Sequence, residues 1–282
     1  MIGFFANIFG YALNWIYLFI NNYGLSIIIF SVLLKILLIP LSIKQQKTMK
    51  KSTEMQKKVK EIQAKYEGNM EKINQETMNL YKEEKMSTFS GCFTAIIQII
   101  LLFSMFYLVR NPLTYMKKID QDVINNYVNE IKEELPENER NITYPEIAVI
   151  KQKGNEDERV FINMDFLGLD LSNVPSQNFS NWTVYIIPVL YVLSSLLSMK
   201  ITTVNTNKKN ENKNENSEKT ELDAVEQANK SMMWFMPIMS VSISLVAPLG
   251  LALYWLVNNV LMILERICIN KYLENKEENE NA

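Results

Sequence analysis

Lys35 is a single charged residue in the middle of a long apolar stretch. It interrupts residues 23–43 (YGLSIIIFSVLLKILLIPLSI), which are otherwise apolar or small and are long enough to cross a bilayer as one helix. A lysine near the middle of a span costs roughly 2.5–3.5 kcal/mol, so such residues usually face a bundle interior or a water-filled cavity. Lys44 follows at about 13 Å along a helix, too far for Lys35 to reach that interface. Lys35 is therefore the first candidate functional residue; the alternative is a lysine bound to carbonyls of a neighbouring helix.

Small polar residues recur at helical spacing in every long apolar stretch. The sets are Ser31 and Ser42 beside Lys35; Ser90, Thr94 and Gln98; Ser194, Ser195 and Ser198; Ser240 and Ser244; and Trp255, Asn258 and Asn259. Residues at this spacing share a helix face, so inward-facing stripes would line one hydrophilic cavity around Lys35. The alternative for any single stripe is close helix packing with interhelical hydrogen bonds. The candidate cavity residues are Lys35, Ser31, Thr94, Gln98, Ser198, Trp255, Asn258 and Asn259.

The apolar stretches themselves predict an all-α polytopic membrane protein with five transmembrane helices. The spans are residues 23–43, 89–109, 182–199, 232–247 and 249–269, and the last two form a tight hairpin through Pro248 and Gly250. Residues 44–85 contain eleven lysines, whereas residues 160–181 contain no lysine or arginine. By the positive-inside rule, the cytoplasmic parts are residues 44–88, the loop 200–231 and the tail 270–282, and the outer part is residues 110–181.

The N-terminal residues 1–22 are apolar but contain Asn7, Asn14 and Asn21 at intervals of seven. This spacing places the three amides on one stripe of a helix, which favours an interfacial helix on the outer surface. A sixth span and a signal peptide are the alternatives, although no lysine or arginine precedes the apolar run as in a signal peptide.

Residues 44–88 show two apolar stripes separated by Gly68 and Asn69, which predicts a cytoplasmic antiparallel helical hairpin. Its candidate docking surface consists of Met55, Val59, Ile62, Tyr66, Met70, Ile73 and Tyr81. Methionine side chains are flexible and polarizable, so they suit contacts with varied partners. The lysine- and glutamate-rich outer faces are what any solvated helix pair would show.

Several classes of chemistry lack their usual residues in this sequence. The chain has no histidine and no phosphate-binding loop of the G-x-x-x-x-G-K-[ST] kind. Its two cysteines, Cys92 and Cys268, are interpreted as reduced packing residues. We therefore expect no catalytic residue, no metal and no cofactor.

The two remaining segments carry less information. Residues 110–181 are polar and acidic, and their apolar stretch FINMDFLGLDL at 161–171 is expected to rest on the membrane surface just before the third span. Residues 205–216 are rich in lysine, asparagine and glutamate, which predicts a disordered stretch in the loop 200–231.

Four segments of the sequence resemble the YidC family of membrane protein insertases. They are YGLSIIIFSVLLKILLIPLSIKQQKTM at 23–49, KINQETMNLYKEEK at 72–85, GCFTAIIQ at 91–98, and MPIMS with APLGLALYWLVNN within 236–259. The resemblance implies a five-helix insertase core with a groove open to cytoplasm and lipid, in which a basic residue on the first span helps receive hydrophilic parts of incoming chains. That residue falls at Lys35. The family usually has arginine there, so this chain keeps the positive charge but lacks the planar guanidinium group that can form two parallel hydrogen bonds.

What the resemblance implies for function is insertion of hydrophobic client segments into a bacterial plasma membrane without nucleotide hydrolysis. The implied partners are nascent membrane proteins and the lipid bilayer, with the ribosome, the signal recognition particle pathway and the Sec translocon as further candidates and no sequence-specific binding to nucleic acid. A small-solute transporter and a membrane-anchored scaffold are the alternatives. A transporter would typically show internal repeats, and a scaffold leaves Lys35 unexplained.

Overall fold

The long helices of this protein form because its apolar runs satisfy their backbone hydrogen bonds internally. A computed structural model describes residues 1–84, 90–207 and 241–281. The helices are α1 (Ile2–Ile20), α2 (Tyr23–Lys65), α3 (Met70–Glu83), α4 (Ser90–Arg110), α5 (Gln121–Glu134), α6 (Pro145–Lys153), α7 (Ile186–Asn207) and α9 (Leu249–Asn281), with the short turns η1 (Leu113–Lys117), η2 (Glu137–Glu139), η3 (Pro175–Gln177) and η4 (Trp182–Tyr185). The antiparallel strands β1 (Asp165–Phe166) and β2 (Leu169–Asp170) form one small hairpin.

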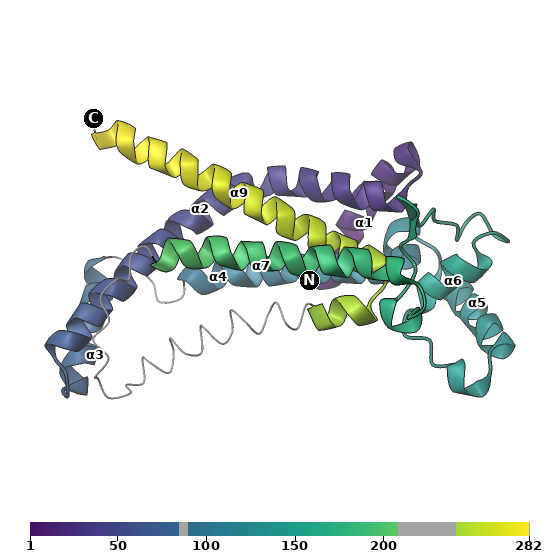
Figure 1. Cartoon of the computed structure of the whole chain (residues 1–282), viewed down its shortest axis with the longest axis horizontal. Helices are drawn as coiled ribbons and strands as arrows, with labels where there is room; N and C mark the ends of the chain where they lie inside the picture. Colours follow the sequence, from purple (N-terminus) through teal and green to yellow (C-terminus); the bar gives the residue numbers. More distant parts are fainter. Residues whose placement is uncertain (85–89, 208–240, 282) are drawn as a thin grey trace.

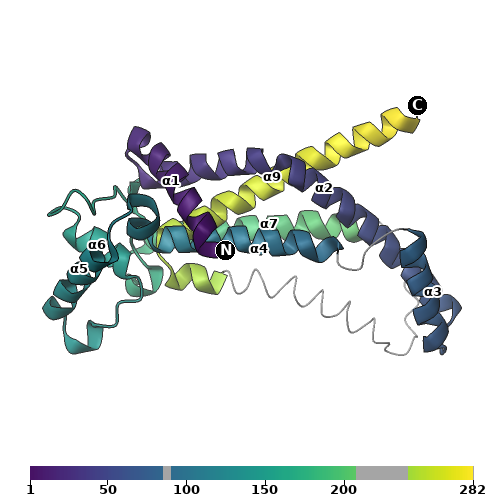
Figure 2. The ribbon, with the colours of Figure 1, turned by 180° about the vertical axis from the view of Figure 1, so that it is seen from behind.

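Helices α4, α7 and α9 and the first half of α2 lie along one another, with α5 and α6 at one end of this bundle and α3 at the other (Figure 1). Seen from behind, α1 crosses the bundle obliquely (Figure 2). Within the described residues, four segments are long and apolar enough to cross a membrane: Ile2–Ile20, Tyr23–Thr48, Trp182–Lys200 and Leu249–Leu273. The chain is therefore a mostly helical, polytopic membrane protein, as the sequence predicts.

Three of the four segments overlap predicted spans, at 23–43, 182–199 and 249–269. The predicted span 89–109 corresponds to α4, whose described apolar part, Ile99–Arg110, is shorter. Most of the predicted span 232–247 lies outside the described residues; residues 241–246 are helical. The number of spans and their limits therefore stay predictions.

Helix α1 qualifies as a span by length and composition, so its interfacial placement also stays a prediction. Its first residue, Ile2, accepts a hydrogen bond from Ser104 in α4, and Lys118 contacts both Asn7 and the ring of Tyr11. Asn21 ends the helix in the left-handed conformation, with φ of 50°. The amide at position 21 is therefore explained by helix capping as well as by a polar stripe.

Helix α2 continues without interruption from the predicted first span into the predicted hairpin. It bends along its length (Figure 1) and contains Pro40, which removes one backbone hydrogen bond of the helix. Gly68, with φ of 81°, lies in the turn to α3, which packs against α2 through Met55, Val59 and Ile73. The result is a helical arm that extends from the bundle (Figure 1).

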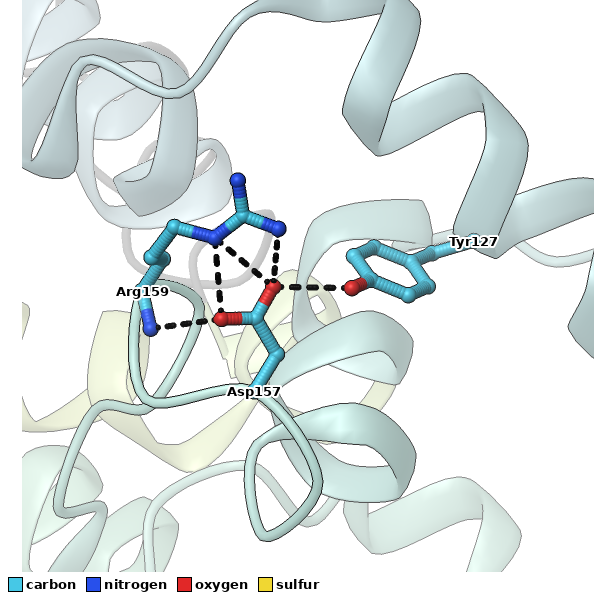
Figure 3. Close-up of polar contacts among 3 residues, drawn as sticks. All are labelled: Tyr127, Asp157 and Arg159. Carbon is cyan, nitrogen blue, oxygen red and sulfur yellow. Dashed lines mark hydrogen bonds and ion pairs between the residues drawn. The ribbon is translucent and has the colours of Figure 1, made fainter.

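Residues 110–181 form a packed unit. In the stretch 161–171, Ile162, Met164 and Phe166 point alternately into the core, while Phe161 and, at the hairpin turn, Leu167 are exposed. The placement of this stretch on the membrane surface therefore stays a prediction. Asp157 accepts hydrogen bonds from Tyr127 of α5 and from Arg159 (Figure 3). The bond from Tyr127 joins the loop that contains Asp157 to α5. The segment is thus organised by its own core.

Candidate functional site

An ion pair joins α2 to α9 in the middle of the bundle. The Nζ atom of Lys35 lies 3.0 Å from Oε2 of Glu265, and the two side chains are 19% and 14% exposed. Two charges at this distance attract strongly when water is largely excluded, although removing both from water costs much of that gain. Lys35 therefore binds a carboxylate, and the alternative of a lysine bound to backbone carbonyls does not describe this contact.

The depth of this pair follows from where its two helices begin. Tyr23 at the start of α2 lies beside Gly250 at the start of α9. Lys35 follows Tyr23 by about 18 Å of helix, and Glu265 follows Leu249 by about 24 Å. Helix α9 crosses α2 obliquely in both views (Figures 1 and 2). Glu265 therefore lies beside Lys35 even though it is further from the start of its own helix.

The β1–β2 hairpin and the residues that flank it tie these two helix starts together. The N–H of Tyr23 donates to the carbonyl of Asn163 at 3.0 Å, and the N–H of Gly250 donates to the carbonyl of Leu171 at 3.0 Å. A third bond runs from the N–H of Leu249 to the carbonyl of Asn173 at 2.9 Å. These donors belong to first helical turns, whose N–H groups have no partner within the helix. We call residues 163–173 the strap, because they hold α2 and α9 in register.

Side chains add to the strap at the start of α2. Asn22 caps α2 by accepting the N–H of Leu25, while its amide donates to the carbonyl of Asp165. Gly24 leaves room for the ring of Phe166, which a Cβ atom at position 24 would overlap. The close approach therefore requires glycine at this position.

A second polar contact joins α9 to α7. The amide of Asn259 donates to Oγ of Ser194 at 2.9 Å, and Asn259 is buried. Ser194 in turn donates to the carbonyl of Tyr191, whose ring lies 6.1 Å from that of Trp255. Asn259 and Trp255, both predicted cavity residues, therefore contribute to the packing of α9 against α7.

The other predicted cavity residues have different surroundings. Ser31 is buried, but its hydroxyl donates to the carbonyl of Ile27 in its own helix, at 2.7 Å. Ser198 and Asn258 are half-buried on α7 and α9. The side chains of Thr94 and Gln98 lie outside the described residues. The structure thus joins Lys35 to a polar partner, and the continuous cavity stays a prediction.

Glu265 is the functional candidate that the sequence analysis missed. It lies next to Arg266 near the end of the apolar run 249–269, where charged residues are expected at a membrane interface. The signal that could have revealed it is Lys35 itself, because a buried charge needs a partner of opposite sign. Cys268, one turn further along α9, is a free and exposed thiol, so its interpretation as a packing residue was wrong.

The predicted docking surface divides into two parts. Met55, Val59 and Ile73 are buried between α2 and α3. Ile62, Tyr66 and Tyr81 are half-buried, and Met70 is exposed, as is Met78 on the same helix. Exposed methionines on α3, rather than the buried stripe, are therefore the adaptable apolar contacts that a partner could reach.

Comparison with known proteins identifies the family. The profile of the family described as 60Kd inner membrane protein matches residues 15–277. The chain belongs to this family of membrane protein insertases. Insertases of this family are not enzymes, which agrees with the expectation from the sequence.

Individual relatives agree with this assignment. The chain is 27% identical over 268 residues to the membrane protein insertase YidC of Treponema denticola, across 94% of this chain and 37% of that relative. It is 26% identical over 290 residues to membrane protein insertase YidC 2 of Listeria innocua, across 99% of this chain and 76% of the relative. A shorter match, 41% identical over 101 residues, covers 36% of this chain and 49% of membrane protein insertase YidC of Caldanaerobacter subterraneus. The chain thus spans about a third of the length of the Treponema protein.

Proposed function

We propose that the chain receives the polar tail of a client segment in a hydrophilic groove between α2, α7 and α9 and releases the apolar part of the segment into lipid. The Lys35–Glu265 ion pair is the observation that carries this proposal, because charges between membrane helices are costly and mark sites that handle polar groups. The contact between Asn259 and Ser194 supplies polar groups on the adjoining side of α9.

The energy for insertion comes from the client. A strongly apolar residue gains about 0.3–0.6 kcal/mol on entering the centre of a membrane, so a client span gains several kcal/mol in total. The groove lowers the opposing cost of carrying a short polar tail partway across, because its polar groups replace water around the tail. No nucleotide hydrolysis is needed for such a partitioning step.

The proposed topology is a core of five transmembrane helices in the bacterial plasma membrane. The arm formed by α2 and α3, the loop 200–231 and the C-terminus lie in the cytoplasm, and residues 110–181 lie outside, as the distribution of lysine and arginine indicates. Helix α1 rests at the outer interface, a placement supported by the contacts of Lys118 with Asn7 and Tyr11. The arm receives nascent membrane proteins, and the ribosome, the signal recognition particle pathway and the Sec translocon are its candidate partners.

Complementation of an insertase-depleted cell tests the role of Lys35. We expect Lys35→Ala to abolish growth, because it removes the cation and leaves Glu265 buried without a partner. Lys35→Arg keeps the cation and can pair with the same carboxylate, so it should support growth. Protein levels must be compared by immunoblot. Full growth with Lys35→Ala at a normal protein level would contradict the proposed groove.

A further inference from the structure

The β1–β2 hairpin turns at Leu167, an exposed leucine in a backbone conformation that leucine rarely adopts. Leu167 has φ of 53° and Gly168 has φ of 77°, so both residues of this two-residue loop are in the left-handed region. Glycine, asparagine and aspartate are the usual residues there, because a bulky side chain strains the backbone. Leu167 is also 86% exposed. In water an asparagine would suit the turn better on both counts, so the leucine needs an explanation outside the turn.

The tip of the hairpin stands clear of the rest of the described chain. A Cβ atom added at Gly168 would meet no atom within 4 Å beyond its two neighbours in the sequence. The side chain before the loop, Phe166, is buried and packs against Gly24 in the first turn of α2. Consecutive Cα atoms are about 3.8 Å apart, so Leu167 projects from the chain close to the start of α2.

The strap lies at the end of the bundle where three candidate membrane segments begin. These segments start at Tyr23, Trp182 and Leu249. Tyr23 and Leu249 donate their N–H groups to the strap carbonyls of Asn163 and Asn173. Trp182 follows the strap by nine residues and is 74% exposed, and tryptophan concentrates at the boundary between hydrocarbon and water. The strap is therefore placed at a membrane–water interface.

An exposed apolar face of α2 continues from this point along the bundle. Leu25, Ile29 and Leu33 recur every four residues and are all exposed, so they share one face of the helix. On a helix that crosses a membrane, an apolar face of this kind contacts hydrocarbon. It begins one residue after Gly24, the residue against which Phe166 packs. Leu167 thus extends an apolar surface that faces lipid.

The charges around the tip favour the acyl chains of a lipid over its headgroup. Residues 160–181 contain no lysine or arginine, and Asp165 and Asp170 flank the loop. Anionic headgroups are not attracted to such a hairpin, so an apolar side chain must supply the binding free energy. A second copy of this chain, docked hairpin to hairpin, would bring four carboxylates together, which is unfavourable. The bilayer is the occupant that fits both the leucine and the aspartates.

We propose that Leu167 anchors the strap in the bilayer, with its side chain inserted among the acyl chains just below the headgroups, at the end of the bundle where α2 and α9 begin. Insertion removes the leucine from water, which offsets the cost of its left-handed backbone. The strap, which holds α2 and α9 in register, is then kept at a fixed depth in the membrane. The anchor does not depend on the client groove, so either can fail without the other.

Collision rates of a nitroxide label measure the depth of the tip. The full chain, with Cys92→Ser and Cys268→Ser, carries the label at Leu167→Cys and is reconstituted in phosphatidylcholine liposomes. Oxygen concentrates in hydrocarbon, whereas a nickel chelate stays in water. The oxygen-to-nickel ratio of collisions should be several-fold higher than at Glu133→Cys, an exposed position on α5, and should approach that at Leu33→Cys.

Three outcomes of this measurement would overturn the anchor. A ratio equal to that at Glu133→Cys would place the tip in water. Few collisions with either reagent, together with broadening between labels, would place a second copy of the chain over the tip. A high ratio that appears only after phosphatidylglycerol is added would mean that headgroup charge, and not the leucine, provides the binding. The assay contains no client, so none of these outcomes bears on the groove.

A tip in water and a tip in lipid predict opposite effects of the same substitution. Leu167→Asn relieves the strain of the turn, so in water it should slow cleavage of the strap by a protease that cuts beside aspartate, at Asp165 and Asp170. If lipid holds the tip, losing the leucine frees it, and cleavage in liposomes should become several-fold faster. Leu167→Met is the matched control: it keeps an apolar side chain and should be cleaved at the wild-type rate. Equal or slower cleavage of Leu167→Asn than of wild-type protein would overturn the inference.

Discussion

Glu146 and Glu265, two glutamates that are largely shielded from water, differ in how many hydrogen-bond partners they have. Glu146 lies in residues 110–181, the segment proposed to lie outside the cytoplasm and called the outer segment below. It is 4% exposed and accepts hydrogen bonds from the N–H of Leu113, the N–H of Thr114 and the hydroxyl of Thr114. Glu265, between the membrane helices, has one cation on one oxygen and no partner on the other among the described residues. Only Glu146 therefore has the full set of partners that is usual for a buried carboxylate with a structural role.

The difference indicates two uses of a buried carboxylate. Glu146 joins α6 to the turn η1 that follows α4, so it connects the outer segment to the bundle. Burial raises its pKa above the ordinary value, against the opposing effect of the hydrogen bonds from Thr114 and Leu113. Glu265 instead retains an acceptor that none of the described residues uses, so it lacks the full set of partners that Glu146 has.

The largest effect that would sharpen this comparison is on stability. Glu146→Ala should destabilise the outer segment by about 2–4 kcal/mol, because three donors lose their acceptor inside a packed core. Pulse proteolysis of the detergent-purified protein across a urea series measures this loss. Glu146→Gln keeps one acceptor oxygen and should cost less.

The same substitution at the second site completes the comparison. Glu265→Ala should lower resistance to urea less than Glu146→Ala does, but should reduce client insertion more. The opposite ranking for the two residues would show that Glu265 is the structural carboxylate, and the distinction between the two sites would be lost.

A smaller effect is expected where the outer segment meets the membrane helices. Asn22→Ala removes both a helix cap and a bond to the strap, at a cost of about 1–2 kcal/mol. Because the strap holds α2 and α9 in register, this change should also reduce insertion. Limited proteolysis of the strap and client insertion by the protein reconstituted in liposomes measure the two consequences.

Asn69→Ala provides the matched control for the strap. Asn69 caps α3 by the same kind of bond, to the N–H of Lys72, but it lies far along the chain from the strap. It should leave both proteolysis of the strap and the position of Lys35 unchanged. Equal loss of insertion with Asn22→Ala and Asn69→Ala would mean that the strap has no special role in aligning the ion pair.

The sequence predicts the membrane helices better than the site between them. Lys35 is visible because a single charge contrasts with a long apolar run, a local signal. Its partner Glu265 is 230 residues away, and no local pattern distinguishes it from an interfacial residue. Polar stripes predicted one cavity, but a hydroxyl such as that of Ser31 can bond to its own helix, which periodicity does not show.

The outer segment is the part that is hardest to predict from the sequence. Its helices α5 and α6 are short, and its key contacts join residues far apart, such as Glu146 with Leu113 and Asn163 with Tyr23. Apolar residues at 162, 164 and 166 alternate, which is typical of a strand with one buried face. Interpreting the stretch by its composition alone missed the strap.

The smallest expected effect is the pH dependence of the outer segment. Hydrogen bonds from Arg159 and Tyr127 hold the pKa of Asp157 well below its ordinary value (Figure 3). A carboxyl whose pKa is lower in the folded than in the unfolded state contributes stability above its unfolded pKa, near 3.9, and loses that contribution as the pH falls through the lower, folded value. Glu146 has the opposite effect on the pH dependence of stability. Because its pKa is raised in the folded state, its contribution to stability grows as the pH falls from the raised pKa toward the ordinary pKa of a glutamate.

Two variants separate these opposing contributions. Asp157→Asn should flatten the loss of protease resistance that wild-type protein shows as the pH falls below about 4, because the unfolded chain then has no carboxylate at position 157 to take up a proton that the folded chain resists. Glu146→Gln should instead steepen the net loss, because the opposing gain on protonation of Glu146 is removed. The Arg159 side chain is 68% exposed, so salt should weaken its contact with Asp157, and the comparison belongs at low ionic strength. Identical pH profiles for wild-type protein and Asp157→Asn would show that the contact in Figure 3 orients the loop without stabilising the segment.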